Sequence, residues 1–287
     1  MFKPCYELRL RSSGMFSVVN EVVHYLHLAQ TKGFEFFIDW RHSCYLDVSR
    51  EGDPWSYYFE PCFENVDRSQ SQGLLPVGTS IACAKDNVIT PRLVDGKCKP
   101  LLLPHDRSVP NSLISKHIHL KPHVKCLIDE FIQTHFAEVT IGLHLRGLGR
   151  NHGGAEQLRA KNNSTSGVDY QRFYKPVDAF LAQNEKAKIL ICSDSQDVID
   201  HTISVYGDRV ITYHSTRSKF GEMHANHPEN EGLTFSSYKL GLDVVIEAYL
   251  LARTDYFIHG NSNVANFVIS LNAQLNSNYV YQGLTHG

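Results

Sequence analysis

The stretch that decides the fold is residues 6–38, which read YELRLRSSGMFSVVNEVVHYLHLAQTKGFEFFI. Apolar and polar residues alternate over 6–11, as in a half-buried β-strand, and a turn follows at Gly14. Residues 15–32 carry apolar side chains at helical spacing, and 34–38 return to a strand pattern. A strand, a glycine turn, a helix and a second strand in about 30 residues form a βαβ unit, with which a Rossmann-like layer begins.

The second half of the chain repeats this alternation. Strand patterns occupy 139–145, 188–192, 209–213 and 256–259, and helical patterns occupy 124–136, 173–184, 196–206, 236–252 and a last stretch ending near Leu271. Such alternation predicts an α/β protein with parallel sheets and helices on both faces. Residues 39–122 have a weaker pattern, so we expect an irregular part of the first lobe there. The expected domains are a first lobe over 1–135 and a second over 136–287.

Composition narrows the class of ligand. The chain has 287 residues, of which 42% are hydrophobic and 20% charged, enough for two lobes with buried cores. Its 28 Lys and Arg residues against 30 Asp and Glu give a net charge of -2. The chain therefore lacks the basic excess that drives binding to nucleic acids or anionic membranes. An anionic ligand must be held by a local pocket.

The cellular compartment is inferred from what the sequence lacks. The first ten residues contain no signal-peptide core, and no run of about 18 apolar residues could cross a membrane. Seven cysteines without a CxxC pair favour reduced thiols. We expect a cytoplasmic protein without a transmembrane segment. The overlapping glycosylation sequons at Asn162 and Asn163 leave open a lumenal catalytic domain of a secretory-pathway enzyme.

No metal site is expected. The pairs His117/His119 and His224/His227 come without a Cys or carboxylate set at zinc-ligand spacing, so solvated loops are the stronger interpretation. The sequence also contains no Asp-x-Asp, the motif with which metal-assisted glycosyltransferases neutralise a diphosphate, and no GxxxxGK[ST] phosphate loop. A diphosphate would therefore be bound by protein groups alone.

Polar residues follow three of the predicted strands of the second half, and the Gly14 turn adds a segment from the first half. The carboxyl ends of parallel strands share one edge of a sheet, where ligands of open α/β sheets bind. We therefore expect these segments to converge. The residues are His144, Arg146, Asp194, Ser262 and Asn263.

The residue types at this edge suit a nucleoside diphosphate. Arg146 offers a planar fork of donors to a diphosphate and a permanent charge to a departing one. Ser262 and Asn263 begin a helix, whose free N–H groups and dipole favour phosphate. Asp194 can accept hydrogen bonds from a guanine edge, and His144 points to the same face as Arg146.

Each of these residues also has an ordinary structural interpretation. Arg146 could be a surface ion-pair partner, Asp194 a turn former and Ser262 a helix cap. His144 could be a core histidine with one hydrogen bond. Their predicted convergence at one sheet edge favours the binding site.

Four stretches carry a family resemblance: 14–20 (GMFSVVN), 141–146 (IGLHLR), 189–195 (ILICSDS) and 243–263 (DVVIEAYLLARTDYFIHGNSN). They resemble the fucosyltransferase superfamily of the core α1,6-fucosyltransferases, the rhizobial nodulation fucosyltransferase and the protein O-fucosyltransferases. The last stretch is the most specific. The resemblance implies a GT-B fold with two Rossmann-like lobes and the donor site in the cleft between them. It also implies an inverting transfer from GDP-fucose to a glycan or protein hydroxyl, without a metal or other cofactor.

The resemblance also assigns roles by position. It implies that Arg146 holds the β-phosphate, that His144 and Asp194 contact the guanosine part, and that Ser262 and Asn263 hold phosphate. The Gly14 turn would approach the fucose. The chain departs from the family after the arginine, because GLGR follows where members often have an acidic pair.

Inversion with deprotonation of the attacking hydroxyl requires a general base, and Glu21 in the first helix is our candidate. A surface carboxylate on an amphipathic helix is its alternative interpretation. Asp243 and Glu247 share a helix face one turn apart, where they could either hold that helix against the site or take part in catalysis.

Two rival functions remain at this stage. One is a GT-B transferase that uses another nucleotide sugar. The other is an inactive homologue that binds a sugar or nucleotide, which the fold alone does not distinguish from an enzyme. The acceptor is expected in the interlobe cleft against 146–167 and 214–231, which are polar and name no particular sugar or peptide.

Overall fold

The computed structural model describes residues 3–64, 66–75, 107–147, 169–218, 223, 236–260 and 262–280. It begins with the predicted βαβ unit, formed by β1 (Cys5–Arg9), α1 (Met15–Lys32) and β2 (Glu35–Asp39). Gly33 ends α1 in the left-handed conformation with φ 76°, and its N–H donates to the carbonyl of Ala29. The first sheet is completed by β3 (Ser71–Leu74) in the order β2-β1-β3, with all strands parallel.

The second sheet has five parallel strands in the order β6-β5-β4-β7-β8. Its central strand places His144 beside Cys192 of β5 and His259 of β7, so that the carboxyl ends of three strands are level. The strands are β4 (Thr140–His144), β5 (Lys188–Cys192), β6 (Val210–Ile211), β7 (Tyr256–His259) and β8 (Asn276–Tyr279).

Helices cover both faces of the second sheet, as the alternating pattern predicts. Ile189 and Ile191 of β5 pack with α7 (Tyr170–Leu181) and α8 (Gln196–Tyr206) in one apolar cluster. Leu190 and Cys192 face the opposite side and belong to the larger cluster that includes α9 (Ser237–Leu251) and α10 (Asn263–Leu271). Strands buried on both faces explain why their sequences are almost continuously apolar.

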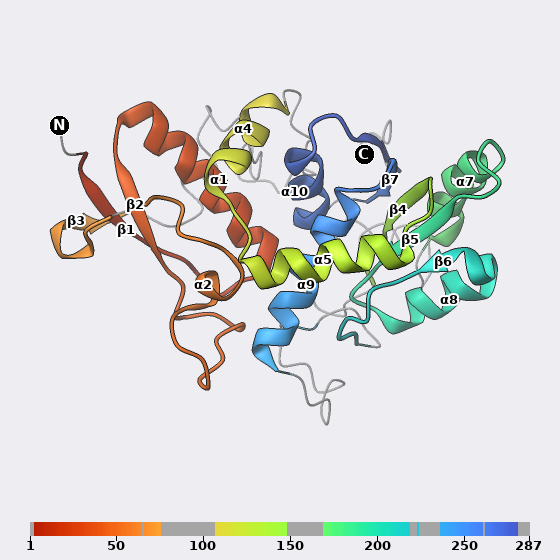
Figure 1. The fold of residues 1–287 in the computed structure, drawn as a ribbon, viewed down its shortest axis with the longest axis horizontal. Coiled ribbons are helices and arrows are strands. Elements are labelled where there is room, and N and C mark those ends of the chain that lie inside the picture. Colours follow the sequence, from red (N-terminus) through yellow and green to blue (C-terminus); the bar gives the residue numbers. More distant parts are fainter. Residues whose placement is uncertain are drawn as a thin grey trace, which may run out of the picture.

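Helices α9 and α10 also pack against the first half of the chain. Helix α10 contacts α1 and α4 (Ser108–His117), while α9 contacts α2 (Pro54–Tyr58) and α5 (Pro122–His135). Figure 1 shows the result: the first sheet lies at one end of the molecule, the second towards the other, and the helices between them form the middle. Side chains from both halves share the larger apolar cluster. The boundary between residues 135 and 136 stays a prediction.

Some expectations need correction. Residues 39–122 contain α2, β3 and α4 in their described part, and β8 follows the last predicted helix. These elements were missed because α2, β3 and β8 are at most five residues long, too short to show a period. The described part of the expected strand 209–213 is paired only over Val210–Ile211. Most of the expected loop 146–167 and of the segment 214–231 lies outside the described residues.

The described residues provide further findings on thiols, metals and membranes. Five cysteines in this part of the chain are free thiols. His117 and His119 contact the backbone carbonyls of Cys62 and Lys116, and His224 and His227 lie outside the described ranges. No helix in the described ranges is long and apolar enough to span a membrane. Nor do the described residues hold a group of three or more side chains suited to bind a metal ion.

Candidate functional site

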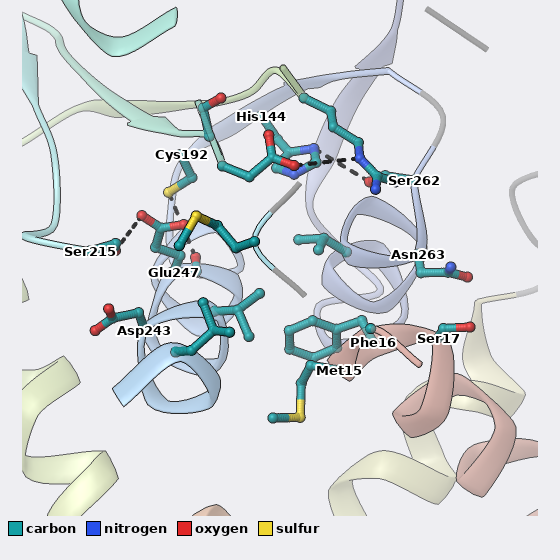
Figure 2. Close-up of a pocket in the computed structure, with 18 of the residues that line it drawn as sticks. Met15, Phe16, Ser17, His144, Cys192, Ser215, Asp243, Glu247, Ser262 and Asn263 are labelled. Carbon is teal, nitrogen blue, oxygen red and sulfur yellow. Dashed lines mark hydrogen bonds and ion pairs between the residues drawn. The ribbon is translucent and has the colours of Figure 1, made fainter. Parts of the chain in front are cut away.

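A pocket of about 290 Å³ lies where the carboxyl ends of β4 and β5 meet the amino-terminal ends of α1 and α10 and one side of α9. Figure 2 shows its wall, with Met15 and Phe16 of α1 facing Glu247 of α9 across the space. Six sequence-predicted residues line it: Gly14, His144, Arg146, Asp194, Ser262 and Asn263. The structure thus brings together segments that are up to 249 positions apart, Gly14 and Asn263 being the extremes (263 − 14).

Two helices begin at this pocket. Helix α1 has 18 residues and starts after Gly14, which offers no side-chain cap, and the N–H of Met15 donates to the Tyr45 hydroxyl over 3.0 Å. Helix α10 has nine residues and is capped by Ser262, whose Oγ accepts from the N–H of Ala265 over 3.0 Å. The positive ends of both helix dipoles therefore favour negative charge in the pocket.

His144 is buried at 9% exposure, and burial, with neighbouring His259 and Arg146, lowers its pKa to about 3. Its ring is therefore neutral at physiological pH. The Nδ1 atom lies 3.4 Å from Ser262 Oγ. Because that hydroxyl oxygen already accepts the Ala265 N–H, we assign its hydrogen to His144 Nδ1 and the ring proton to Nε2. His144 and Ser262 thus form a neutral pair on the pocket wall.

Arg146 is held by Asp194. The guanidinium Nε lies 3.5 Å from Asp194 Oδ2, and the backbone N–H of Gly147 donates to Oδ1 over 2.8 Å. The two side chains are 31% and 28% exposed, so solvent screens the ion pair and its contribution to stability is small. Its geometric effect is to anchor the chain as it leaves β4. The expected contact of Asp194 with guanosine stays a prediction.

Glu21 does not line the pocket. Its Oε2 accepts from Arg11 Nε over 3.1 Å, while Arg11 itself lines the pocket and donates to Ser17 Oγ over 2.8 Å. Glu21 therefore positions a pocket arginine in this structure. A role as general base would require it to leave that arginine.

Two carboxylates of α9 line the pocket as well, and their roles were left open by the sequence. Asp243 accepts from Lys239 Nζ at 2.6 Å and from the Thr216 N–H at 2.8 Å. Both groups balance its charge. The i,i+4 acidic spacing was the available signal, but a helix pattern does not reveal what faces it across the pocket.

Glu247 is the more unusual carboxylate. Its Oε1 accepts from Ser215 Oγ at 2.6 Å and from the Arg217 guanidinium at 3.0 Å. Burial nevertheless raises its pKa to about 7, with Arg217 and Ser215 opposing the rise. A pocket carboxylate that titrates near neutral pH is characteristic of functional sites.

The part of the pocket beside Glu247 has apolar walls. They come from β5, α9 and the described residue at position 223, and all four side chains are largely removed from solvent. The residues are Cys192, Met223, Leu240 and Val244. Apolar walls with one or two fixed polar groups are the usual construction of a site for a flat organic ring.

Comparison with known proteins identifies the fold. No protein-family model matches the chain, and no curated protein sequence matches it. Among solved structures, the fucosyltransferase NodZ from Bradyrhizobium matches with a TM-score of 0.55 and 17% identity, over 100% of this chain and 98% of that one. A NodZ α-1,6-fucosyltransferase crystallised with GDP matches with a TM-score of 0.54 and 18% identity, over 96% and 93% of the two chains.

Two further structures extend the likeness. Arabidopsis thaliana FUT1 in complex with GDP has a TM-score of 0.54 at 14% identity, covering 96% of this chain and 70% of that one. POFUT1 in complex with GDP has a TM-score of 0.53 at 11% identity, over 98% and 99% of the chains. The chain therefore has the GT-B fold of these fucosyltransferases, as the sequence resemblance implies.

Proposed function

We propose that this chain is an inverting glycosyltransferase that transfers fucose from GDP-fucose to a hydroxyl of a glycan or protein. The observation that carries the proposal is the convergence of Arg146 and the first turns of α1 and α10 on one pocket. The comparison supports the choice of donor, because similar structures were solved with GDP or GDP-fucose.

The diphosphate is assigned to the end of the pocket between the two helices. The N–H groups of the first turns of α1 and α10 and the guanidinium of Arg146 give that end a positive potential. The Ser262 hydroxyl and the Asn263 amide add neutral donors. We place the β-phosphate at Arg146, whose charge would stabilise the negative charge that grows on GDP as the glycosidic bond breaks.

The guanine ring is assigned to the apolar end beside Glu247. Guanine presents N1–H and N2–H donors side by side, and an ionised carboxylate accepts both in a bidentate pair. Glu247 is the carboxylate on that part of the wall, which makes it a further candidate beside His144 and Asp194 for contacts with the guanosine part.

The reaction needs little beyond positioning and charge stabilisation. The acceptor hydroxyl attacks C1 of the sugar from the face opposite to GDP, its C–O bond forms as the C1–O bond to the β-phosphate breaks, and its proton passes to a base or to water. Arg146 and the helix termini would balance the departing charge without a metal ion, which fits the lack of an Asp-x-Asp motif. Glu21 stays our proposed base.

The test is a comparison of ligands on the purified protein. GDP and GDP-fucose should raise the melting temperature, while UDP at the same concentration should have a smaller effect. Stabilisation by UDP but not by GDP would support a transferase for another nucleotide sugar instead. Incubation with GDP-fucose should then release GDP, and Arg146→Ala should abolish that release. GDP binding without any turnover across a panel of glycan and protein acceptors would indicate the inactive homologue.

A further inference from the structure

Arg217 is a buried arginine immediately behind the pocket wall. Its side chain is 5% exposed and does not line the pocket, although its neighbours Ser215 and Thr216 do. Its nitrogens donate to backbone carbonyls at the end of β5 and in the segment after β6, and to one carboxylate on α9. The partners are Ser193 O at 3.2 Å, Ser215 O at 3.1 Å, Tyr213 O at 2.7 Å, Thr212 Oγ1 at 2.9 Å and Glu247 Oε1 at 3.0 Å.

This arrangement fixes one oxygen of Glu247. Both side-chain hydrogen bonds that the carboxylate receives from described residues, from Ser215 and from Arg217, end on Oε1. The second oxygen, Oε2, receives none of them. Because a planar guanidinium with five bonds has little freedom to rotate, the plane of the carboxylate is fixed as well.

We infer that Arg217 is a positioning residue that holds Glu247 in one orientation, with Oε2 available to the nucleobase of the donor. The inference rests on the proposed function, because it takes guanine as the ligand of Glu247. Arg217 would touch no substrate atom. Its effect would pass through the carboxylate, as outer groups orient the ligands of many sites.

The charges around Glu247 give this role a measurable signature. Burial, Asp243 and Asp194 raise the pKa of Glu247, while Arg217 and the hydrogen bond from Ser215 lower it, and the balance is about 7. Lys239 pairs with Asp243, and Arg146 pairs with Asp194. An ionised carboxylate accepts from guanine, so binding weakens as pH falls below the pKa of Glu247. Without the charge of Arg217 that pKa rises, and binding weakens at a higher pH.

The experiment measures GDP affinity by calorimetry from about pH 5.5 to about pH 8.5 for the wild type, Arg217→Gln and Arg217→Lys. The phosphates of GDP also titrate near pH 6, so the ratio of wild-type to variant affinity is compared at each pH, where that contribution cancels. For Arg217→Gln we expect a ratio of about ten or more at the acidic end that shrinks as pH rises, since one unit of pKa is tenfold. Arg217→Lys keeps the charge and should give a smaller ratio. A ratio independent of pH would mean a merely structural role and would overturn the inference.

Two further variants keep the test decisive if Arg217→Gln does not fold. Ser215→Ala removes the other donor to Oε1 and should show the same pH-dependent ratio with a smaller amplitude. In the background of Glu247→Gln, which cannot ionise, the pH dependence of the Arg217→Lys ratio should vanish. Its persistence there would also overturn the inference. Failure of the wild type to bind GDP would instead overturn the proposed function, so the two failures are distinguishable.

Discussion

The side-chain amide of Asn20 donates a hydrogen bond of 3.0 Å to the backbone carbonyl of Asn263, across 243 positions of sequence. Asn20 is buried in α1, and Asn263 is the first residue of α10. The bond therefore joins the two helices close to the ends that begin at the pocket. It fixes their relative position where the diphosphate is proposed to bind.

Asn20→Ala should weaken GDP binding more than its effect on stability suggests. Loss of one buried hydrogen bond costs about 1 kcal/mol of unfolding free energy, and the carbonyl of Asn263 would lose its partner. Asn20→Asp should be worse, because two acceptors would then face each other. Calorimetry with GDP and thermal unfolding measure the two effects.

The matched control is Asn184→Ala. Asn184 also donates from its amide to a backbone carbonyl, that of Phe180 at 3.0 Å, but it lies beyond α7 and away from the pocket. It should lose comparable stability and bind GDP normally. Equal GDP affinity in both variants would show that binding does not depend on the bond between the two helices.

Substitution of Arg146 should impair the chemical step. Removal of one group that stabilises developing charge typically costs about a hundredfold or more in rate, so Arg146→Ala should lose at least that in GDP release from GDP-fucose. Arg146→Lys keeps the charge without the planar fork and should recover only part of it. Arg172→Ala on α7, an arginine paired with Asp169 outside the pocket, is the control and should keep the wild-type rate. Wild-type activity of Arg146→Ala would remove this residue from the mechanism.

The sequence predicts the long elements well because each repeats its signal several times. Helix α1 has the predicted bounds, since an apolar face of five turns is followed by Gly33, whose φ of 76° suits a glycine at that position. Strand β8 was missed because its four residues, NSNY, include only one large apolar side chain. Its pairing with β7 comes from tertiary contacts.

The candidate site was predictable as far as the edge of a parallel sheet determines it. Arg146, Asp194 and Ser262 each follow a strand of the second sheet, so the topology alone brings them together. Arg217 follows β6, which pairs over only two residues, and the path of the chain beyond it depends on its own contacts. The pairing of Glu21 with Arg11 likewise depends on how α1 folds back on the end of β1.

Stability should fall in mild acid because of two buried histidines. Burial lowers the pKa of His144 to about 3 and that of His259 to about 4, against 6.5 for an ordinary histidine. Below about pH 6.5 the unfolded chain binds protons that the folded chain does not, so each histidine costs about 1.4 kcal/mol per pH unit down to its folded pKa. Glu247 acts in the opposite sense, because its raised pKa makes stability fall as pH rises from about 4.5 to about 7.

His259→Phe isolates one of these contributions. The ring stacks near Phe257 and Tyr279, and its Nδ1 donates to the carbonyl of Gly260, so the variant loses one hydrogen bond and keeps an aromatic ring. Relative to wild type, its stability should improve by about 1.4 kcal/mol for each pH unit between about pH 6.5 and about pH 4. Chemical denaturation at several pH values measures this. A difference from wild type that stays constant with pH would contradict it.

Ser262→Ala should reduce both stability and GDP affinity, because Ser262 is at once a helix cap and a pocket residue. The cap is worth about 1 kcal/mol. Ser236→Ala is the matched control, since Ser236 caps α9 through a hydrogen bond of 3.2 Å from the N–H of Lys239 and does not line the pocket. Both variants should lose similar stability in urea. Only Ser262→Ala should also bind GDP more weakly, through loss of its hydroxyl and of its contact with His144. If the two variants bind GDP equally well, Ser262 acts as a cap alone and the phosphate must be held by Arg146 and the backbone N–H groups.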